Sequence, residues 1–338
     1  MVKGSFPIIL ALFFVFAGQS IFAQKKMDKI DKEIESARNK TGEVVICSPS
    51  GKVPGTLTID EASKRLRPGM VLRLLPGNYN PLDMVIFEQD RLIVESDNSG
   101  GYVNMPLYLY GKDCIVRSLN IRGVEADSGI IIDTKAHGIT ITSGEKRGSA
   151  IIANCATNGM MLYDNGQDIT VRNTSIVNGA EVCEEVKVVQ TRTYSTHSTG
   201  YVYNIINFGK MERKGKVSFE KCMLFSDGHL FNGDHASMKL INLTLDDNLI
   251  WCKRSLFSVP LKAIDLKTID KLKSFFNLDK GSRNVFERPK LKLEPGGWSD
   301  GRPGIFIVTT GNGSNKEYGC NMSESKSIPV PFEMNKSK

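Results

Sequence analysis

The sequence predicts an all-β protein folded as a single-stranded, right-handed parallel β-helix, and three observations lead to this prediction. The first is a ladder of short segments that each begin with an apolar anchor, at residues 94, 116, 141, 171, 219 and 240. The second is the spacing of these anchors, which is typical of a solenoid with a period of roughly 20–30 residues. The interval from Val171 to Phe219 is longer and is interpreted as two turns. The third is that each unit holds short strands and leaves no room for a helix, which excludes helical repeats.

A second ladder of strand segments accompanies the first. It consists of residues 108–110, 131–133, 162–164 and 230–232, each separated from the next anchor by a turn. Strands of successive coils pair about 4.8 Å apart, so residues one coil apart in sequence become neighbours in space. The right-handed sense follows from the strong preference of parallel crossovers. Asn173 and Asn242 share one offset from their anchors, which predicts an asparagine ladder at a corner of the coil.

Residues 1–23 are typical of a secretory signal peptide. Lys3 supplies the positive charge, a short apolar core follows, and small residues lead to a cleavage site after Ala23. We therefore expect a secreted or periplasmic protein without stable membrane insertion after cleavage; an uncleaved membrane anchor is the alternative. Residues 24–54 form a leader, in which apolar residues at helical spacing between 25 and 38 predict a short helix.

The solenoid is expected over residues 55–255, in roughly seven or eight coils. Thr58-Ile59-Asp60-Glu61 is a capping box that begins a helix over 59–66, and this helix should cover the open N-terminal end. Apolar residues within 256–310 predict a short helical segment that caps or flanks the C-terminal end. Residues 311–338 are rich in Gly, Ser, Asn and Lys, which favours a flexible tail.

The coils resemble those of a known superfamily. Strand pieces such as Asp168 to Ile176, with turns rich in glycine and asparagine, resemble the right-handed parallel β-helix proteins of the pectate-lyase-like superfamily. The resemblance covers roughly residues 55–255 and implies the fold rather than one reaction, because the superfamily includes lyases, hydrolases, epimerases, adhesins and proteins without catalysis. The polygalacturonase-type aspartate cluster and the pectate-lyase calcium and arginine motifs are absent from this sequence.

The composition bounds the class of partner. With 41% hydrophobic residues, 24% charged residues and a net charge of +7, the chain is an ordinary globular protein that is mildly basic. This charge suits an acidic polysaccharide; the alternative is that it serves solubility alone. Export and the lack of a dense basic cluster argue against nucleic acid. The seven cysteines leave at least one unpaired, and Cys155 and Cys183 are a pair that one coil would bring within bridging distance.

One coil lacks an inward apolar anchor near residue 195, and its residue types suit polysaccharide chemistry. A β-eliminating lyase needs a base beside the proton that is removed and a cation that neutralises the sugar carboxylate. Lys187, Arg192 and His197 are therefore the candidate catalytic residues. Tyr194, Tyr201 and Tyr203 are the candidate substrate-binding residues, because aromatic rings offer a flat platform for sugars. The alternative is a solvated loop with incidental aromatic side chains.

A column of acidic residues gives a candidate metal site. Asp133, Asp164 and Asp234 precede strand segments at comparable offsets, and carboxylates stacked on neighbouring coils would bind Ca²⁺. Two such carboxylates would equally suit the acid/base pair of a glycoside hydrolase, and turn capping by the same side chains is the structural alternative. The sequence thus predicts an exported protein that acts on or binds an acidic polysaccharide, as a polysaccharide lyase or as a non-catalytic carbohydrate-binding or structural protein.

Overall fold

The structure is a computed structural model. It describes residues 29–81, 84–97, 101–142, 148–163, 168–178, 204–209, 213–226, 228–252, 255–259, 262–264, 272–287, 291–294 and 307–310. The chain divides into two compact units, Met1–Lys40 and Thr41–Lys338. The described part of the first unit is a helix over residues 29–39, which confirms the helix predicted from the apolar spacing there.

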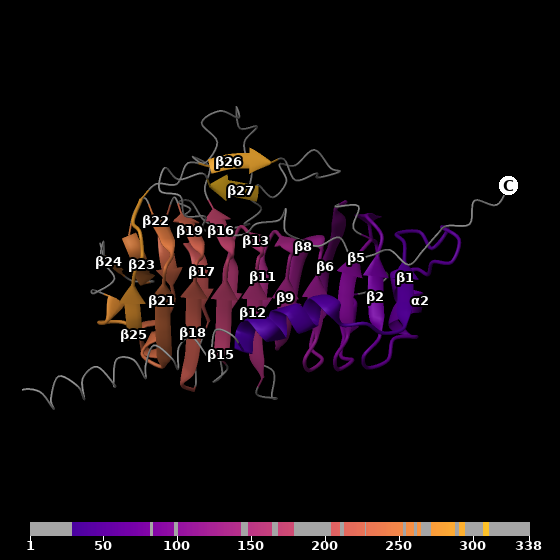
Figure 1. Cartoon of the computed structure of the whole chain (residues 1–338), viewed down its shortest axis with the longest axis horizontal. Helices are drawn as coiled ribbons and strands as arrows, with labels where there is room; N and C mark the ends of the chain where they lie inside the picture. Colours follow the sequence, from indigo (N-terminus) through magenta and orange to yellow (C-terminus); the bar gives the residue numbers. More distant parts are fainter. Residues whose placement is uncertain are drawn as a thin grey trace, which may run out of the picture. The chain divides into compact units, whose positions relative to one another are not determined.

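The second unit is a right-handed parallel β-helix, as the sequence predicts, and its first face is a ten-stranded parallel sheet, here called sheet A (Figure 1). Each strand pairs in parallel with the strand one coil away. The strands of sheet A are β1 (Val44–Cys47), β2 (Val71–Leu74), β5 (Ile93–Ser96), β7 (Ile115–Arg117), β9 (Gly129–Ile132), β12 (Ser149–Ala153), β15 (Asp168–Arg172), β18 (Gly215–Glu220), β21 (Ile241–Asp246) and β25 (Asn277–Ser282). Sheet A therefore extends beyond residues 55–255 at both ends.

A second sheet of fifteen strands supplies two further faces, because each coil bends once more after leaving sheet A. Face B1 contains β3 (Gly77–Asn78), β10 (Lys135–Ala136), β13 (Ala156–Thr157), β16 (Ser175–Asn178), β19 (Met223–Ser226) and β22 (Leu249–Cys252). Face B2 contains β4 (Ile86–Phe87), β11 (Ile139–Ile141), β14 (Met160–Leu162), β17 (Asn204–Phe208), β20 (His229–Asn232), β23 (Ser255–Val259) and β24 (Lys262–Ile264). The long strands β6 (Val103–Leu109) and β8 (Asn120–Ala126) run through both faces.

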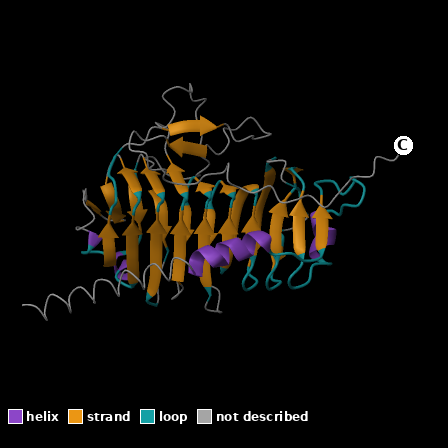
Figure 2. Ribbon diagram, viewed as in Figure 1, coloured by secondary structure: helices purple, strands orange, loops and turns teal. Residues whose placement is uncertain are grey.

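Strands dominate this unit and its few helices lie at or near coil ends (Figure 2). Helix α2 (Ile59–Ser63) begins at the capping box, where the Thr58 side chain accepts from the Glu61 amide and Glu61 accepts from the Thr58 amide. Its Ile59 and Ala62 are buried against the first coil, as the predicted cap requires. Helix α3 (His235–Met238) follows β20. A short antiparallel hairpin is formed by β26 (Leu291–Glu294) and β27 (Ile307–Thr310).

The core consists of inward side chains stacked in register along each face. In sheet A the central column is Leu72, Val94, Val116, Ile131, Ile152, Val171, Phe219 and Leu245. All of these side chains are buried and belong to one continuous apolar cluster. Since each coil covers the next, an inner face that could not be buried by a single coil becomes buried in the stack.

The corner between sheet A and face B1 explains the polar residues that follow each strand of sheet A. The first residue after the strand adopts positive φ values of 46–61° at Ser118, Asp133, Asn154, Asn173, Lys221, Asp247 and Arg283. Asn and Asp tolerate this left-handed conformation better than most side chains. The next residue turns back into the interior, as Thr134, Cys155 and Cys222 do. The Cys155 thiol donates to the carbonyls of Ile131 and Ala153, and Cys183, its predicted partner, lies outside the described residues.

Two of the predicted anchors are wrong in register. Ile141 lies in β11 on face B2, where it pairs with Ala126 and Leu162, and Ile131 takes the place predicted for it in sheet A. The prediction assigned Ile131 and Ile141 to each other's ladders. The reason is that Val116 pairs directly with Ile131, and the number of residues between them is much smaller than the assumed period. In the β21 coil the anchor is Leu245, which pairs with Phe219, and Leu240 precedes the strand.

The long interval between Val171 and Phe219 is one coil and not two. Val171 pairs directly with Phe219, so no further strand of sheet A separates β15 from β18. The extra length, residues 179–203, lies between β16 on face B1 and β17 on face B2 and is outside the described residues. The predicted ladder of Asn173 and Asn242 is also wrong, because Asn242 pairs with Lys216 within sheet A.

An asparagine ladder does exist one residue beyond the corner. Asn248 is buried, its side-chain amide donates to the Phe219 carbonyl at 2.9 Å, and its side-chain oxygen accepts from the Cys222 amide at 2.8 Å. It also donates to the Asn284 side chain of the next coil at 3.0 Å. These bonds satisfy the backbone at the corner.

Sheet A also carries a buried ion triad on three adjacent strands. Glu95 of β5 accepts from Arg73 of β2 at 2.6 Å and from Arg117 of β7 at 2.7 Å, one guanidinium on each carboxylate oxygen. The side chains of Arg73, Glu95 and Arg117 are 12%, 1% and 6% exposed. The triad alternates with the inward column of Leu72, Val94 and Val116, so the three charges lie outside the apolar core.

Candidate functional site

The residues predicted to carry the reaction fall outside the described residues. Lys187, Arg192, Tyr194, His197, Tyr201 and Tyr203 belong to residues 179–203, and Asp164 belongs to residues 164–167. What the fold does establish is where the chain around them leaves and re-enters the coil. It leaves face B1 after Asn178 of β16 and returns to face B2 at Asn204 of β17. The end of β16 and the start of β17 are therefore the parts of the described structure closest in sequence to them.

The outer side of face B2 carries two polar and aromatic rows that cross successive coils in register, here called the B2 rows. The first is Tyr108, Glu125, Thr140, Met161, Asn207 and Asn232. The second is Tyr110, Asp127, Thr142 and Tyr163, whose backbone amides continue the same ladder. Inward neighbours such as Val124 and Leu162 are buried, so the rows result from the alternation of a strand with one covered face.

A cavity of 250 Å³ opens on face B2 where it bends away from face B1. Its polar lining comes from three consecutive coils, with His137, Asn158 and Asn207 as the groups able to orient a ligand. Gly138 and Gly159 lie at the bend between them and leave the backbone accessible. Small residues at this corner and polar residues beside it are what a binding site for a flat, hydroxylated ligand requires.

His137 is held in the cavity wall by Asn158. Its ring Nδ1 lies 3.1 Å from the Asn158 side-chain nitrogen, and the Asn158 backbone amide donates to the His137 carbonyl. Loss of hydration lowers the pKa of His137, and the positive charge of Arg122 lowers it further. This shift favours the neutral imidazole, in which Nδ1 can accept from the Asn158 amide while Nε2 carries the proton.

Two carboxylates stand on one strand within the B2 rows. Tyr110 donates to Glu125 at 2.5 Å from the preceding coil, and Thr142 donates to Asp127 at 2.5 Å from the following coil. Burial raises the pKa of Asp127, the bond from Thr142 opposes this rise, and the charge of Glu125 adds to it. Burial and the bond to Glu125 also raise the pKa of Tyr110, so its hydroxyl stays a donor.

Exposed apolar surface lies beside these polar groups. Met161 and Tyr163 of the β14 coil are each 37% exposed, on neighbouring B2 rows. The Tyr163 ring lies over Gly209, where a Cβ atom would meet the ring at 1.9 Å. The absence of a side chain at residue 209 therefore leaves room for the ring. A flat, exposed aromatic ring is the group on which the apolar side of a sugar packs.

The two described aspartates of the predicted metal site lie on different elements. Asp133 is buried at the corner after β9 and accepts from the Asn154 side chain at 2.6 Å. Asp234 is the N-cap of α3, where bonds from Ser237 and Ala236 lower its pKa. The Asp234 side chain thus caps the local backbone, as the structural alternative predicts, whereas the Asp133 side chain bonds a side chain of the next coil. Within the described ranges no three acidic, His or Cys side chains cluster as a metal site would require, and a Ca²⁺ requirement stays a prediction.

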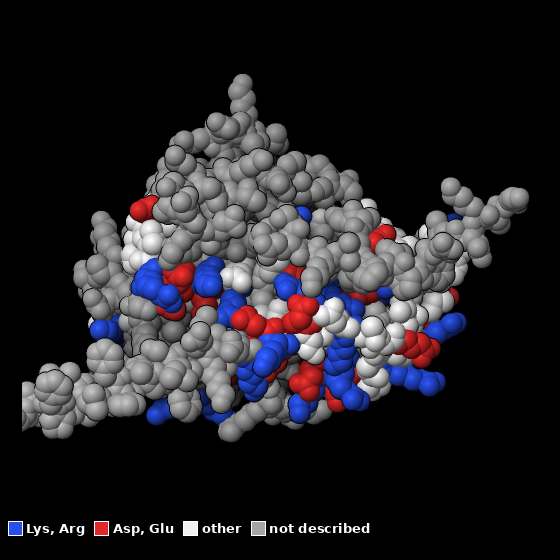
Figure 3. All heavy atoms as spheres, in the orientation of Figure 1, with Lys and Arg blue, Asp and Glu red and all other residues white. Residues whose placement is uncertain are grey.

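Charges of both signs are interspersed over the described surface seen in Figure 3. In this view the described positive side chains do not collect into one patch. No helix among the described residues has the length and apolarity of a membrane span.

Comparisons with known proteins assign no family to this chain. No protein-family model matches the sequence, and no curated protein matches it. Among solved structures, the chain is similar to the crystal structure of pectate lyase Pel9A, with 11% identity, a TM-score of 0.36 and coverage of 68% of this chain and 80% of that chain. This likeness is too distant to bear on the reaction. The β-helix assignment rests on the strand register described above.

Sequence reasoning missed most of the B2 rows. Glu125, Asp127 and Thr142 were hidden because the coil that joins Val116 to Ile131 is much shorter than the period assumed. Without the correct register, His137 could not be assigned its neighbour Asn158. The sequence pattern that would identify these residues is the constant number of residues between an inward Ile or Val of sheet A and the glycine at the bend of the same coil.

Proposed function

We propose that this protein binds a polysaccharide along the outer side of face B2. The observation that carries the proposal is the pair of B2 rows, which cross at least four consecutive coils in unbroken register. Neighbouring coils are about 4.8 Å apart, so the rows repeat hydrogen-bonding and aromatic groups at a short, constant interval. A polymer of similar sugar units presents its hydroxyl groups with a comparable regularity.

Both kinds of contact that sugars need are available on this face. Thr140, Asn158 and Asn207 offer hydroxyl and amide groups that donate and accept hydrogen bonds, and Tyr163 and Met161 offer exposed apolar surface. Ordered polar groups beside an aromatic platform are the usual composition of a small-ligand site. Asn207 is held by a bond from Asn232 at 3.0 Å, which fixes its amide before a ligand binds.

The charges on the face divide it into two halves. Arg122 lies on the side of the cavity, where an acidic sugar group would be attracted. Glu125 and Asp127 lie further along the same strand, where a second anion would be repelled. We therefore infer a polysaccharide that carries acidic groups on only some of its sugar units, rather than one with a carboxylate on every unit.

Hydrolysis is a second candidate function, favoured by the raised pKa of Asp127 beside Glu125. Two carboxylates at alternate positions of one strand stand about 7 Å apart along it, within the range at which inverting glycosidases hold an acid and a base. Asp127 would protonate the leaving oxygen and Glu125 would activate water. β-Elimination by Lys187, Arg192 and His197 stays a prediction. The two reactions differ in product, since only elimination yields an unsaturated, ultraviolet-absorbing end.

The binding proposal is tested by a glycan screen followed by calorimetry. The purified protein is screened against neutral, uronic and sulfated polysaccharides, and oligosaccharides of the best hit are titrated into wild type and a double variant, Asn158→Ala with Tyr163→Ala. Loss of one hydrogen bond and one aromatic contact removes about 2 kcal/mol, so Kd should rise about thirtyfold. Reducing-end and ultraviolet assays on the same hit separate hydrolysis from elimination.

The matched control is Asp168→Asn, an exposed residue of β15 on sheet A, which should leave Kd unchanged. The proposal is rejected if the double variant, with wild-type thermal stability, binds as tightly as the wild type, or if no glycan binds. Asp127→Asn distinguishes the second candidate, because it should abolish any release of reducing ends while oligosaccharide binding persists.

A further inference from the structure

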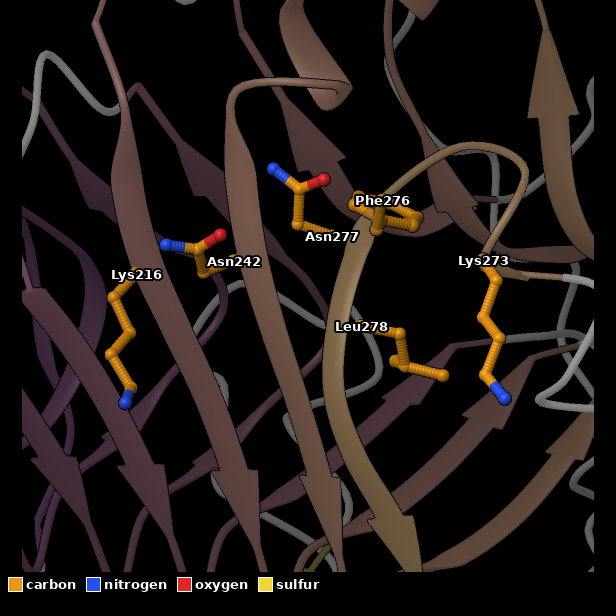
Figure 4. A pocket seen from close by; sticks show the side chains of 6 residues that line it. All are labelled: Lys216, Asn242, Lys273, Phe276, Asn277 and Leu278. Atoms are coloured by element: carbon orange, nitrogen blue, oxygen red, sulfur yellow. The ribbon is translucent and has the colours of Figure 1, made fainter.

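A second cavity, of 560 Å³, lies at the C-terminal end of sheet A, on other strands than the B2 rows. Its described lining is Lys216, Asn242, Lys273, Phe276, Asn277 and Leu278. Lys216, Asn242 and Asn277 are register partners on β18, β21 and β25, so three polar side chains form one row across three coils. Figure 4 shows the two asparagines between the two lysines.

The floor of this cavity is rigid. Phe276 is 2% exposed and makes edge-on contacts with Phe208 and Phe231, at ring-centroid distances of 5.4 and 5.8 Å. Asn277, the next residue, donates its side-chain amide to the Lys239 carbonyl at 3.1 Å, which fixes the side chain at the rim. A site held by packed aromatic rings does not need to reorganise when a ligand enters.

The polar groups of the lining all favour an anionic ligand. Two ammonium groups and two amides line the cavity, and no carboxylate is among its described lining residues. Lysine binds oxyanions as a compact point charge with three donors, and asparagine amides donate to the same oxygens. Leu278, which is half-buried, adds an apolar group to the lining, which a free inorganic anion would not use.

We propose that this cavity binds an anionic sugar, meaning a sugar ring that bears a carboxylate, sulfate or phosphate group. The oxyanion is attracted by the ammonium groups of Lys216 and Lys273 and accepts from the amides of Asn242 and Asn277, and the ring packs on Leu278. The volume falls in the range of ordinary ligand sites and exceeds what one oxyanion needs. The site is independent of polysaccharide binding on face B2 and does not require it.

Calorimetry with small probes tests this proposal. Glucuronate, glucose 6-sulfate, glucose 6-phosphate, glucose and inorganic phosphate are titrated into the full protein at low salt. At least one charged sugar should bind, and tighter than both glucose and phosphate. Lys216→Gln and Lys273→Gln should each weaken that binding about tenfold, and higher salt should weaken it further.

Lys214→Gln is the matched control, because Lys214 is an exposed lysine shortly before Lys216 and outside the lining. It should leave the affinity unchanged. Equal binding of glucose would contradict the role of the anion, and phosphate binding as tightly as the charged sugars would contradict the role of the ring. Equal losses in Lys214→Gln and Lys216→Gln would show a diffuse charge effect and overturn the site. The Asn158→Ala, Tyr163→Ala variant should bind these probes normally, so the two proposals fail separately.

Discussion

The buried ion triad of sheet A offers a sharp test of the fold, through the substitution Glu95→Gln. The carboxylate of Glu95 is 1% exposed and neutralises two guanidinium groups that are themselves 12% and 6% exposed. Glutamine keeps the volume and loses the charge. Arg73 and Arg117 would then be left as buried cations without their shared counter-ion.

The expected cost is large because a broken buried ion pair leaves an uncompensated charge. Removal of one partner of such a pair typically destabilises a protein by about 3–5 kcal/mol. The matched control is Asp246→Asn, which breaks the 2.8 Å pair with Arg283 at the other end of the same sheet. Those side chains are 27% and 60% exposed, so that loss should be at most about 1 kcal/mol.

Denaturant unfolding and amide hydrogen exchange measure the effect. Each coil contacts only its neighbours, so exchange in Glu95→Gln should accelerate in β2, β5 and β7 while β18 and β21 stay protected. A stability equal to that of Asp246→Asn, or acceleration spread evenly over sheet A, would refute the buried triad. Replacement of all three residues by apolar side chains of similar size should restore most of the loss, because desolvation offsets much of the attraction within such groups.

Three further outcomes follow. Lys221→Asn should stabilise the protein by up to about 1 kcal/mol in thermal unfolding, because Lys221 has φ = 53° and Asn tolerates that conformation better; a loss of stability would contradict the corner geometry. Asp234→Ala should cost about 1 kcal/mol through loss of the α3 cap. Because the folded pKa of Asp234 is lowered, its contribution is present above its unfolded pKa and disappears as pH falls through the folded pKa; an unchanged difference from Asp234→Ala in acid would be inconsistent with this. Mass spectrometry of exported protein should give a mature N-terminus directly after Ala23, and a start at Met1 would refute the signal peptide.

The fold was predictable because each coil of a solenoid repeats the same pattern of inward apolar residues. Val94, Val116, Val171 and Phe219 were placed in one column from apolar periodicity alone, and the structure confirms that column. The capping box at Thr58 was also predictable from the sequence, since its hydrogen bonds join residues within one turn of the chain. Signals that depend on a few neighbouring residues can be read from one sequence.

Register was not predictable to the same degree because coil length varies. A short coil between Val116 and Ile131 and a long one between Val171 and Phe219 average to a plausible period that neither obeys. Face B2 depends on this register, since Asn158 and His137 become neighbours only when β11 and β14 are correctly paired. A site assembled from outward residues of several coils therefore follows from the structure and not from a local motif.

The most direct test of the central claim is a crystal structure of the protein with an oligosaccharide of the glycan that it binds best. We predict a sugar chain that crosses β8, β11 and β14 on the outer side of face B2, with one ring on Tyr163 and hydroxyl groups bonded to Thr140 and Asn158. An oligosaccharide bound elsewhere, with face B2 bare in fully occupied crystals, would contradict the assignment.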